Sequence, residues 1–172
     1  MIDLDVSIQG VDWQDQFPEY DDCIKVCFKT IVEHMPEGRN FAKFSHLELS
    51  IRLTDDLEIQ QLNRRHRGQD KPTNVLSFPS LSDEQIKKFF KEGRDIPAYP
   101  VALGDIIFAL GAIEKEAAAQ GKSLADHFCH LCLHGMLHLL GYDHIEDDEA
   151  EEMEAAEKML LSKLSIDDPY QD

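Results

Sequence analysis

The chain has 172 residues, 42% of them apolar and 30% charged, values typical of a globular domain with its own hydrophobic core. Its formal net charge of −17 argues against a broadly basic nucleic-acid-binding protein. The acidity is concentrated in residues 1–23 and 143–172, whereas residues 24–142 carry no net charge. A basic patch in this middle region can therefore contact phosphate, because salt screens charge repulsion beyond about 8 Å.

The sequence indicates neither a membrane span nor a secretory signal. No apolar run reaches the roughly 18 residues that a transmembrane helix needs. The N-terminal stretch MIDLDVSIQG has no basic start and no long apolar core. We therefore expect a cytoplasmic protein without membrane association.

Hydrophobic periodicity predicts an alternation of strands and helices along the chain. Strands are expected at residues 3–9, 45–54, 74–79 and 101–110. Helices are expected at residues 18–35, 55–67, 111–119, 124–140 and 146–164. The polar stretch 80–99 is expected to be a surface excursion with one short helix. These elements predict one α+β domain over residues 1–172, with a mixed sheet of about four strands packed on helices.

Four cysteines occur as two closely spaced pairs, at positions 23, 27, 129 and 132. In a cytosolic chain of this size, free buried thiols are the expected state. Cys129 and Cys132 form a CxxC pattern, which can mark a redox or zinc site. They lie in an apolar helix without the usual turn, so we interpret Cys23, Cys27, Cys129 and Cys132 as core residues.

Three histidines lie close together in the stretch HGMLHLLGYDH, residues 134–144. His134 and His138 are four residues apart, so they share one face of a helix and can point at one atom. Gly141 can end that helix in a left-handed turn and return His144 on the following loop. Three imidazoles with an open fourth position are typical of a catalytic zinc site. The rest of the helix is apolar nearly all round, which predicts a central, buried helix.

Two more histidines share the same stripe of this helix. At 100° per residue around the helix axis, an arc of about 80° contains four histidines: His127, His130, His134 and His138. His127 and His130 are expected either to approach the substrate, to support a metal ligand, or to pack and bond locally.

The spacing of the three motif histidines resembles that of the metzincin peptidases. Those enzymes carry a glutamate directly after the first histidine, where it serves as general base. This chain has Gly135 at that position. The metal arrangement is therefore kept, but peptide hydrolysis would lack its proton acceptor.

The segment LNRRHRGQDKPTNVLSFP is locally basic and ends in the third expected strand, residues 74–79. Taken alone, it is the end of a solvated, charged helix. Next to a metal site, its arginines suit a phosphate-bearing substrate, because guanidinium binds phosphate through two parallel hydrogen bonds.

Together, HGMLHLLGYDH, RGQDKPTNVLSFP and LGDIIFAL resemble the YbeY family of bacterial metal-dependent endoribonucleases and rRNA maturation factors. The resemblance covers about residues 45–165. It implies that His134, His138 and His144 bind one zinc ion per chain, and that Arg67 is the functional arginine. It also implies a single-stranded RNA substrate, namely the 3′ end of 16S ribosomal RNA, and ribosomal small-subunit particles and proteins as partners.

Four further residues are assigned accessory roles on chemical grounds. Lys71, Arg65 and His130 are candidates for contacts with the substrate. Asp143 is a candidate either for orienting a ligand imidazole or for a local turn in GYDH. No residue stands out as general base, so water and the RNA 2′-hydroxyl both remain possible nucleophiles.

Two other functions fit the same residues. One is a different metallohydrolase such as a peptidase, against which Gly135 speaks. The other is a non-catalytic ribosome-assembly factor in which zinc only stabilises the fold.

Overall fold

The structure, a computed structural model, describes residues 1–10 and 12–171. Four strands in this part of the chain form one mixed sheet in the order β1-β2-β4-β3. They are β1 (Ile2–Ile8), β2 (Leu47–Thr54), β3 (Val75–Pro79) and β4 (Val101–Ala109). β2 pairs in parallel with β1 and β4, whereas β3 runs antiparallel to β4 at the edge. The expected α+β fold with a four-stranded mixed sheet is confirmed.

The five expected helices are present, with ends that differ by at most two residues. They are α2 (Tyr20–His34), α4 (Asp56–Arg67), α6 (Leu110–Gln120), α7 (Leu124–Leu139) and α8 (Asp147–Lys163). The excursion after β3 contains α5 (Asp83–Ile86) and a π-helical turn, η1 (Lys87–Lys91). Two short helices were not expected, α1 (Trp13–Gln16) and α3 (Gly38–Phe41), because a single turn carries no readable periodicity.

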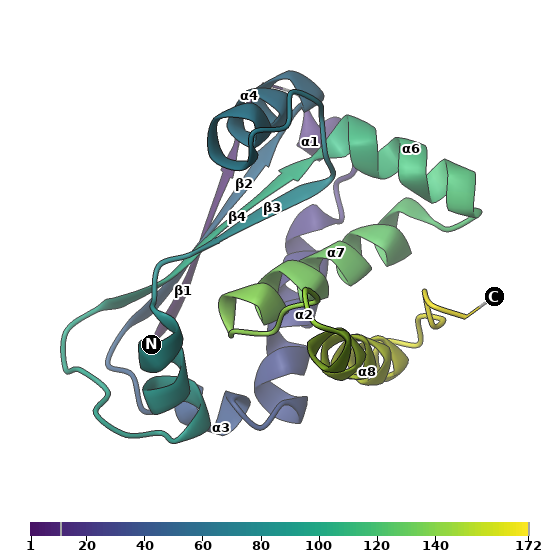
Figure 1. The fold of residues 1–172 in the computed structure, drawn as a ribbon. Helices are drawn as coiled ribbons and strands as arrows, with labels where there is room; N and C mark the ends of the chain where they lie inside the picture. The colour runs from purple at the N-terminus through teal and green to yellow at the C-terminus, as the bar shows by residue number, and fades with distance from the viewer. Residues whose placement is uncertain (11, 172) are drawn as a thin grey trace.

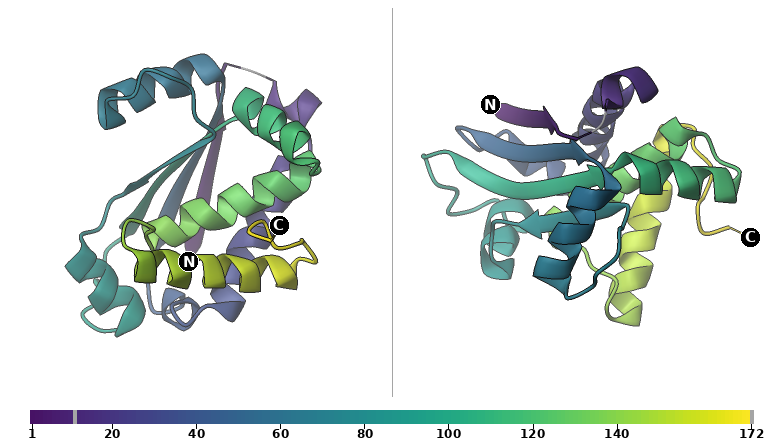
Figure 2. Two further views of the ribbon diagram at one scale, coloured as in Figure 1. Left: turned by 45° about the vertical axis from the view of Figure 1, so that its right-hand side comes forward. Right: turned by 90° about the horizontal axis from the view of Figure 1, so that it is seen from above.

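The helices cover both faces of the sheet (Figures 1 and 2). α4 lies on one face, while α7, α2 and α8 gather on the other. Strand β4 is therefore buried on both sides after its midpoint, with Ile106 and Phe108 facing α7 and Ile107 facing α4. None of the helices in the described residues combines the length and apolar composition that a bilayer crossing requires.

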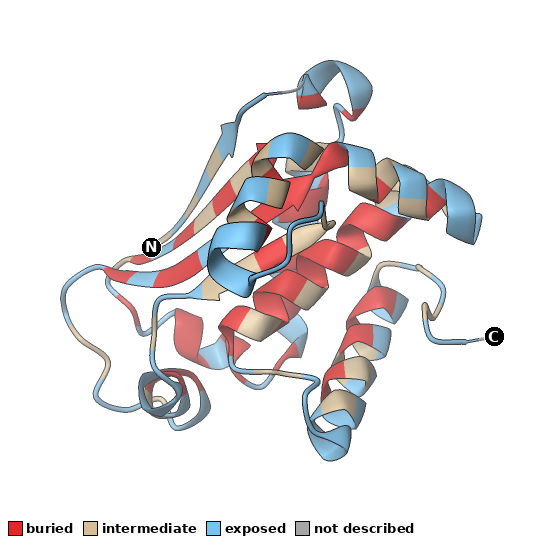
Figure 3. Cartoon of the chain, turned by 45° about the horizontal axis from the view of Figure 1, so that its top comes forward, coloured by how far each residue is buried: buried red, intermediate tan, exposed pale blue. Residues whose placement is uncertain are grey.

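The core is built around α7, which is buried along most of its length (Figure 3). Phe128 of α7 is fully buried, and its ring centroid lies 5.7 Å from that of Trp13, 5.2 Å from Phe17 and 4.9 Å from Phe108. Trp13 also donates a hydrogen bond of 3.0 Å from Nε1 to the carbonyl oxygen of Thr54. This cluster joins α1, α7 and β4, and it confirms the expected central position of α7.

The four cysteines are free and buried where α2 packs on α7. Sγ of Cys27 lies 3.7 Å from the carbonyl oxygen of Cys129. Contact with Cys129 and burial raise the pKa of Cys23, and burial raises the pKa of Cys132. The thiols therefore stay protonated near neutral pH and act as small apolar side chains.

Replacing Phe128 by alanine should destabilise the protein by about 3–5 kcal/mol, because the substitution leaves a cavity in the aromatic cluster. Denaturant unfolding followed by circular dichroism measures this loss. Tyr99→Ala is the matched control, since the Tyr99 side chain is 68% exposed, and it should change stability little. Equal effects of the two substitutions would contradict the central role of Phe128.

Candidate metal centre and cleft

The helix that carries the motif is fixed at both ends by local interactions. At its start, the Ser123 side chain accepts a hydrogen bond of 3.1 Å from the backbone N–H of Asp126. At its end, Gly141 has a φ of +94°, a left-handed conformation that glycine adopts without strain. The N–H of Tyr142 then bonds the carbonyl oxygen of Leu137 at 3.1 Å. The chain reverses as expected and brings the following loop back over the last turn of α7.

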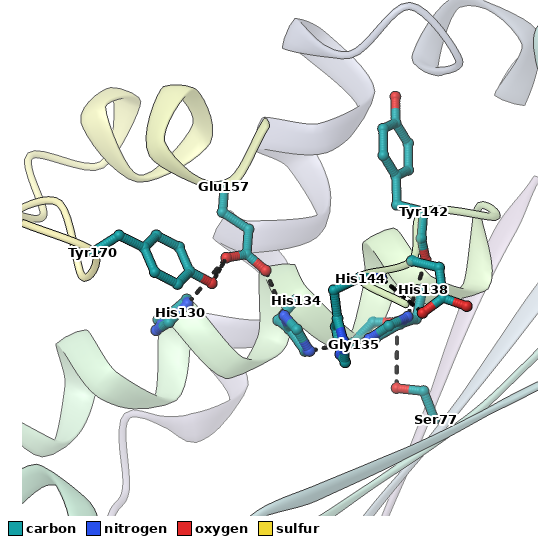
Figure 4. A network of polar contacts seen from close by, with 10 residues as sticks. Ser77, His130, His134, Gly135, His138, Tyr142, His144, Glu157 and Tyr170 are labelled. Atoms are coloured by element: carbon teal, nitrogen blue, oxygen red, sulfur yellow. Dashed lines mark hydrogen bonds and ion pairs between the residues drawn. The ribbon is translucent and has the colours of Figure 1, made fainter. Parts of the chain in front are cut away.

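This reversal places three imidazoles around one point (Figure 4). Ring centroids of His134 and His138 are 4.5 Å apart, and the ring of His144 lies 5.6 Å and 5.1 Å from them. Each residue offers one nitrogen, and these three nitrogens all lie within 4.8 Å of one another. The His134 and His138 rings are partly buried, whereas His144 is exposed. The trio therefore stands at the boundary between core and solvent.

Hydrogen bonds on the outer nitrogens orient two of these rings. Nδ1 of His138 donates to the carbonyl oxygen of Tyr142 at 2.9 Å, and Nδ1 of His134 donates to the carboxylate of Glu157. When both imidazoles are neutral with Nδ1 protonated, the two Nε2 atoms present lone pairs to each other at 3.0 Å. Facing lone pairs repel unless a cation lies between them, so this donor set fits a metal ion.

The environment also favours the metal-binding form of His138. Burial, with the adjacent His134 and His144, lowers the pKa of His138 to about 4. The imidazole is therefore neutral at physiological pH. Neutral imidazole is the form that ligates metals, because the nitrogen lone pair must be free.

The sequence interpretation missed Glu157 of α8. Its side chain has no solvent exposure and contacts His134, His130 and Tyr170. Burial alone would raise the pKa of this carboxyl, but hydrogen bonds from these three residues lower it to about 2. One signal was available, since Glu157 stands four residues after Met153 and three before Leu160, on the apolar face of α8.

The other candidate residues near the motif form contacts with neighbouring protein groups. Oδ1 of Asp143 accepts a hydrogen bond of 2.7 Å from the backbone N–H of His144, which is the turn role considered above. Nε2 of His130 lies 3.3 Å from Glu157, and His130 lines a separate cavity of about 140 Å³ beside the start of α7. Nε2 of His127 lies 2.8 Å from Glu116, and burial lowers the pKa of His127.

A cleft of about 630 Å³ opens beside the histidine trio. Strand β3, the loop before it, the end of α4 and the Gly141–Ile145 loop form its walls. Arg67 and Lys71 line this cleft together with His134, His138 and His144. Arg65 is exposed on α4 and is not among the lining residues. The structure thus brings one arginine and one lysine of the basic segment to the candidate metal site.

Arg67 is held in place although it lies at the surface. Its Nη2 donates to the carbonyl oxygen of Ser77 at 3.1 Å. Its Cζ lies 5.7 Å from the ring centroid of Phe78, within cation–π range. Phe78 itself packs against the apolar cluster between α4 and the sheet. Arg67 also lines the cleft.

Gly135 faces the sheet rather than open solvent. A Cβ atom at this position would lie 3.1 Å from Oγ of Ser77 and 3.1 Å from Cγ2 of Ile106. Any side chain at position 135 would therefore require Ser77 or Ile106 to shift by a few tenths of an ångström. The physical role of Gly135 is close helix–sheet packing, and the carboxylate of a metzincin has no equivalent at this position.

Comparison with known proteins adds to this geometry. A family model described as "Endoribonuclease YbeY" matches residues 11–165. The chain belongs to the endoribonuclease YbeY family. Membership in this family confirms the resemblance noted in the sequence, and it makes the chain an RNA-cleaving hydrolase by homology.

Individual members of the endoribonuclease YbeY family are similar to this chain in sequence. The chain is 56% identical over 124 residues to the endoribonuclease YbeY of Paramagnetospirillum magneticum, covering 72% of this chain and 71% of that one. It is 46% identical over 146 residues to that of Azorhizobium caulinodans, covering 85% and 80%. The solution structure of TM1509 from Thermotoga maritima matches 97% of this chain and 99% of its own with a TM-score of 0.52. At 21% identity, this last similarity shows a shared fold alone.

Removing one of the three imidazoles should abolish tight metal binding. After incubation with zinc and dialysis, His138→Ala should retain far less metal than the wild type, because two imidazoles hold zinc weakly. Elemental analysis of the purified protein measures the ratio of zinc to protein. His34→Ala, an exposed histidine outside the motif, is the control and should keep the wild-type zinc content. Full zinc retention in His138→Ala would contradict the assigned ligand set.

Proposed function

We propose that the chain is a zinc-dependent, single-strand-specific endoribonuclease that matures the 3′ end of 16S ribosomal RNA and acts in ribosome quality control in the cytoplasm. The observation that carries the metal part is the convergence of His134, His138 and His144 beside a cleft that also holds Arg67. Ribosomal small-subunit particles and their proteins are the proposed partners. The RNA substrate is supported by the name of the family, and its ribosomal origin by the resemblance of the motifs.

Zinc is the proposed ion because of the number and type of donors. Three imidazoles are the protein ligands of known catalytic zinc sites, whereas structural zinc sites use four protein ligands. When bound, zinc would supply Lewis-acid polarisation of a phosphoryl oxygen and an acidified water. Imidazoles also accept iron and nickel, so metal analysis of protein made in unsupplemented medium tests the choice.

Arg67 is proposed to stabilise the charge that develops on the reacting phosphate. Its guanidinium is already oriented by Ser77 and Phe78, so little reorganisation accompanies binding. Lys71, on the loop before β3, is proposed to hold a flanking phosphate. Either water or the RNA 2′-hydroxyl serves as nucleophile, and mapping the product ends distinguishes them, since attack by the 2′-hydroxyl leaves a cyclic phosphate.

The remaining sequence candidates contribute less directly under this proposal. Arg65 is exposed on α4 and would contact RNA only outside the cleft. His130 faces Glu157 and a different cavity, so we assign it no contact with the reacting phosphate.

The two alternatives make different predictions. A peptidase needs a general base near the ion, and Gly135 supplies none at the position where metzincins carry their glutamate. Casein cleavage with intact RNA would nevertheless favour it. A non-catalytic assembly factor would bind small-subunit particles without any chelator-sensitive cleavage of ribosomal RNA. Assays on both naked RNA and particles separate these outcomes.

Arg67→Ala should lower the rate of RNA cleavage by about 10²–10³-fold, the usual cost of losing one charge-stabilising donor. Zinc content and melting temperature should stay near wild type, because Arg67 is at the surface and bonds no metal ligand. Single-turnover cleavage of a 16S 3′-end fragment measures the rate. Arg39→Ala, an exposed arginine on α3, is the matched control. Wild-type cleavage by Arg67→Ala would refute the role.

Lys71→Ala should weaken RNA binding with little change in the cleavage rate at saturation, since the proposed contact of Lys71 is with a flanking phosphate. In a plot of the logarithm of the binding constant against the logarithm of the salt concentration, the slope should become less steep by about 0.7. This is the change expected for one lost phosphate contact with single-stranded RNA. Fluorescence anisotropy at several salt concentrations measures this slope. An unchanged slope would remove Lys71 from the RNA path.

A further inference from the structure

We propose that Glu157 is a positioning residue of the metal centre, and that Tyr170 of the C-terminal segment clamps it against His134. This inference rests on the proposed metal site, since it concerns how one of the three ligands is oriented. It adds to that site a residue from α8 and a residue from the segment that follows α8.

The orientation follows from the contacts of the two carboxylate oxygens (Figure 4). Oε1 of Glu157 accepts the Nδ1 proton of His134. Because an ionised carboxylate only accepts, Nδ1 of His134 must carry a proton, and in the neutral imidazole the lone pair is then on Nε2. That Nε2 atom is the one that faces His138 at 3.0 Å. Glu157 therefore selects both the tautomer and the direction of the imidazole.

The second oxygen prevents the carboxylate from turning away. Oε2 of Glu157 contacts Nε2 of His130 at 3.3 Å and accepts a hydrogen bond from the hydroxyl of Tyr170. A carboxylate held at both oxygens cannot rotate without breaking a bond. The contact with His134 is thus fixed from the side opposite to the metal.

The position of Glu157 would otherwise be occupied by an apolar residue. It lies on the buried face of α8 between Met153 and Leu160, and its side chain has no solvent exposure. Burying a carboxylate is costly unless its hydrogen bonds are satisfied. A leucine in this position would close the α7–α8 interface without that cost, so packing alone gives no reason for an acid.

The segment after α8 is folded back to supply Tyr170. Nζ of Lys158 lies 3.6 Å from Asp168 and 5.9 Å from the centre of the Tyr170 ring, which ties this segment to α8. The same ring packs at 5.8 Å from that of His130. Tyr170 is 40% exposed, so it covers Glu157 from the solvent side.

The test compares zinc affinity in the full chain by competition with a chromophoric chelator. Glu157→Gln should bind zinc about 10–100-fold more weakly, the usual cost of losing a partner of a ligand imidazole. Tyr170→Phe should weaken zinc binding by a smaller factor, about 3-fold, because the carboxylate remains but one of its restraints is lost. Glu151→Gln, an exposed acid of α8, and Tyr99→Phe are the controls and should bind zinc as wild type does.

A purely structural role would change the melting temperature of the metal-free variants but leave their zinc affinity intact. Cobalt(II) absorption gives a second readout, because its visible bands report ligand geometry and should shift in Glu157→Gln. If Glu157→Gln folds and binds zinc within twofold of wild type, the inference is overturned while the metal site stands. If Glu157→Gln fails to fold, Tyr170→Phe decides, and unchanged affinity overturns the proposal. If wild type binds no metal, the proposed site and this inference both fall.

Discussion

Ser77 joins the two halves of the candidate site. Its side chain donates to the carbonyl oxygen of Gly135 at 3.4 Å, and its own carbonyl oxygen accepts from Arg67 at 3.1 Å. One residue of the edge strand thus fixes the helix with the histidines on one side and the guanidinium on the other. The edge strand thus contacts both the helix that carries the histidines and the arginine, and it ties the two parts of the site together.

This link depends on how closely α7 approaches the sheet. Gly135 leaves just enough space for Ser77 and Ile106, and the fully buried Phe128 holds the N-terminal half of the helix in the aromatic cluster. The face of α7 toward α2 is closed by small thiols at Cys129 and Cys132. Different faces of α7 thus pack on the sheet and on α2, and His134 and His138 lie on the part of the helix that lines the cleft.

The parts of the site that the sequence predicted are those encoded by local spacing. His134 and His138 share a face because the helical repeat requires it, and Gly141 predicts the reversal that returns His144. Glu157 could not be placed in the same way, because its contact with His134 depends on how α8 packs on α7, 23 residues later in the chain. The carboxylate expected near the ligands was Asp143, whose neighbour in sequence takes its hydrogen bond instead. Aspartate side chains in turns commonly bond a nearby backbone N–H in this way, which competes with bonds to more distant groups.

The three metal-binding histidines do not distinguish phosphodiester cleavage from peptide cleavage; the residues around them do. Three imidazoles in this spacing serve either reaction, since the ion supplies the same polarisation in both. Gly135 packs closely on Ser77 and Ile106 of the sheet, and it supplies no carboxylate where a metzincin peptidase has its general base. In the cleft beside the histidines, Arg67 and Lys71 bring two positive charges into a chain of net charge −17, and Asp83 and Asp143 also line it. Arg67 and Lys71 can contact an anionic substrate beside the histidine trio, and under the proposed function that substrate is the RNA backbone.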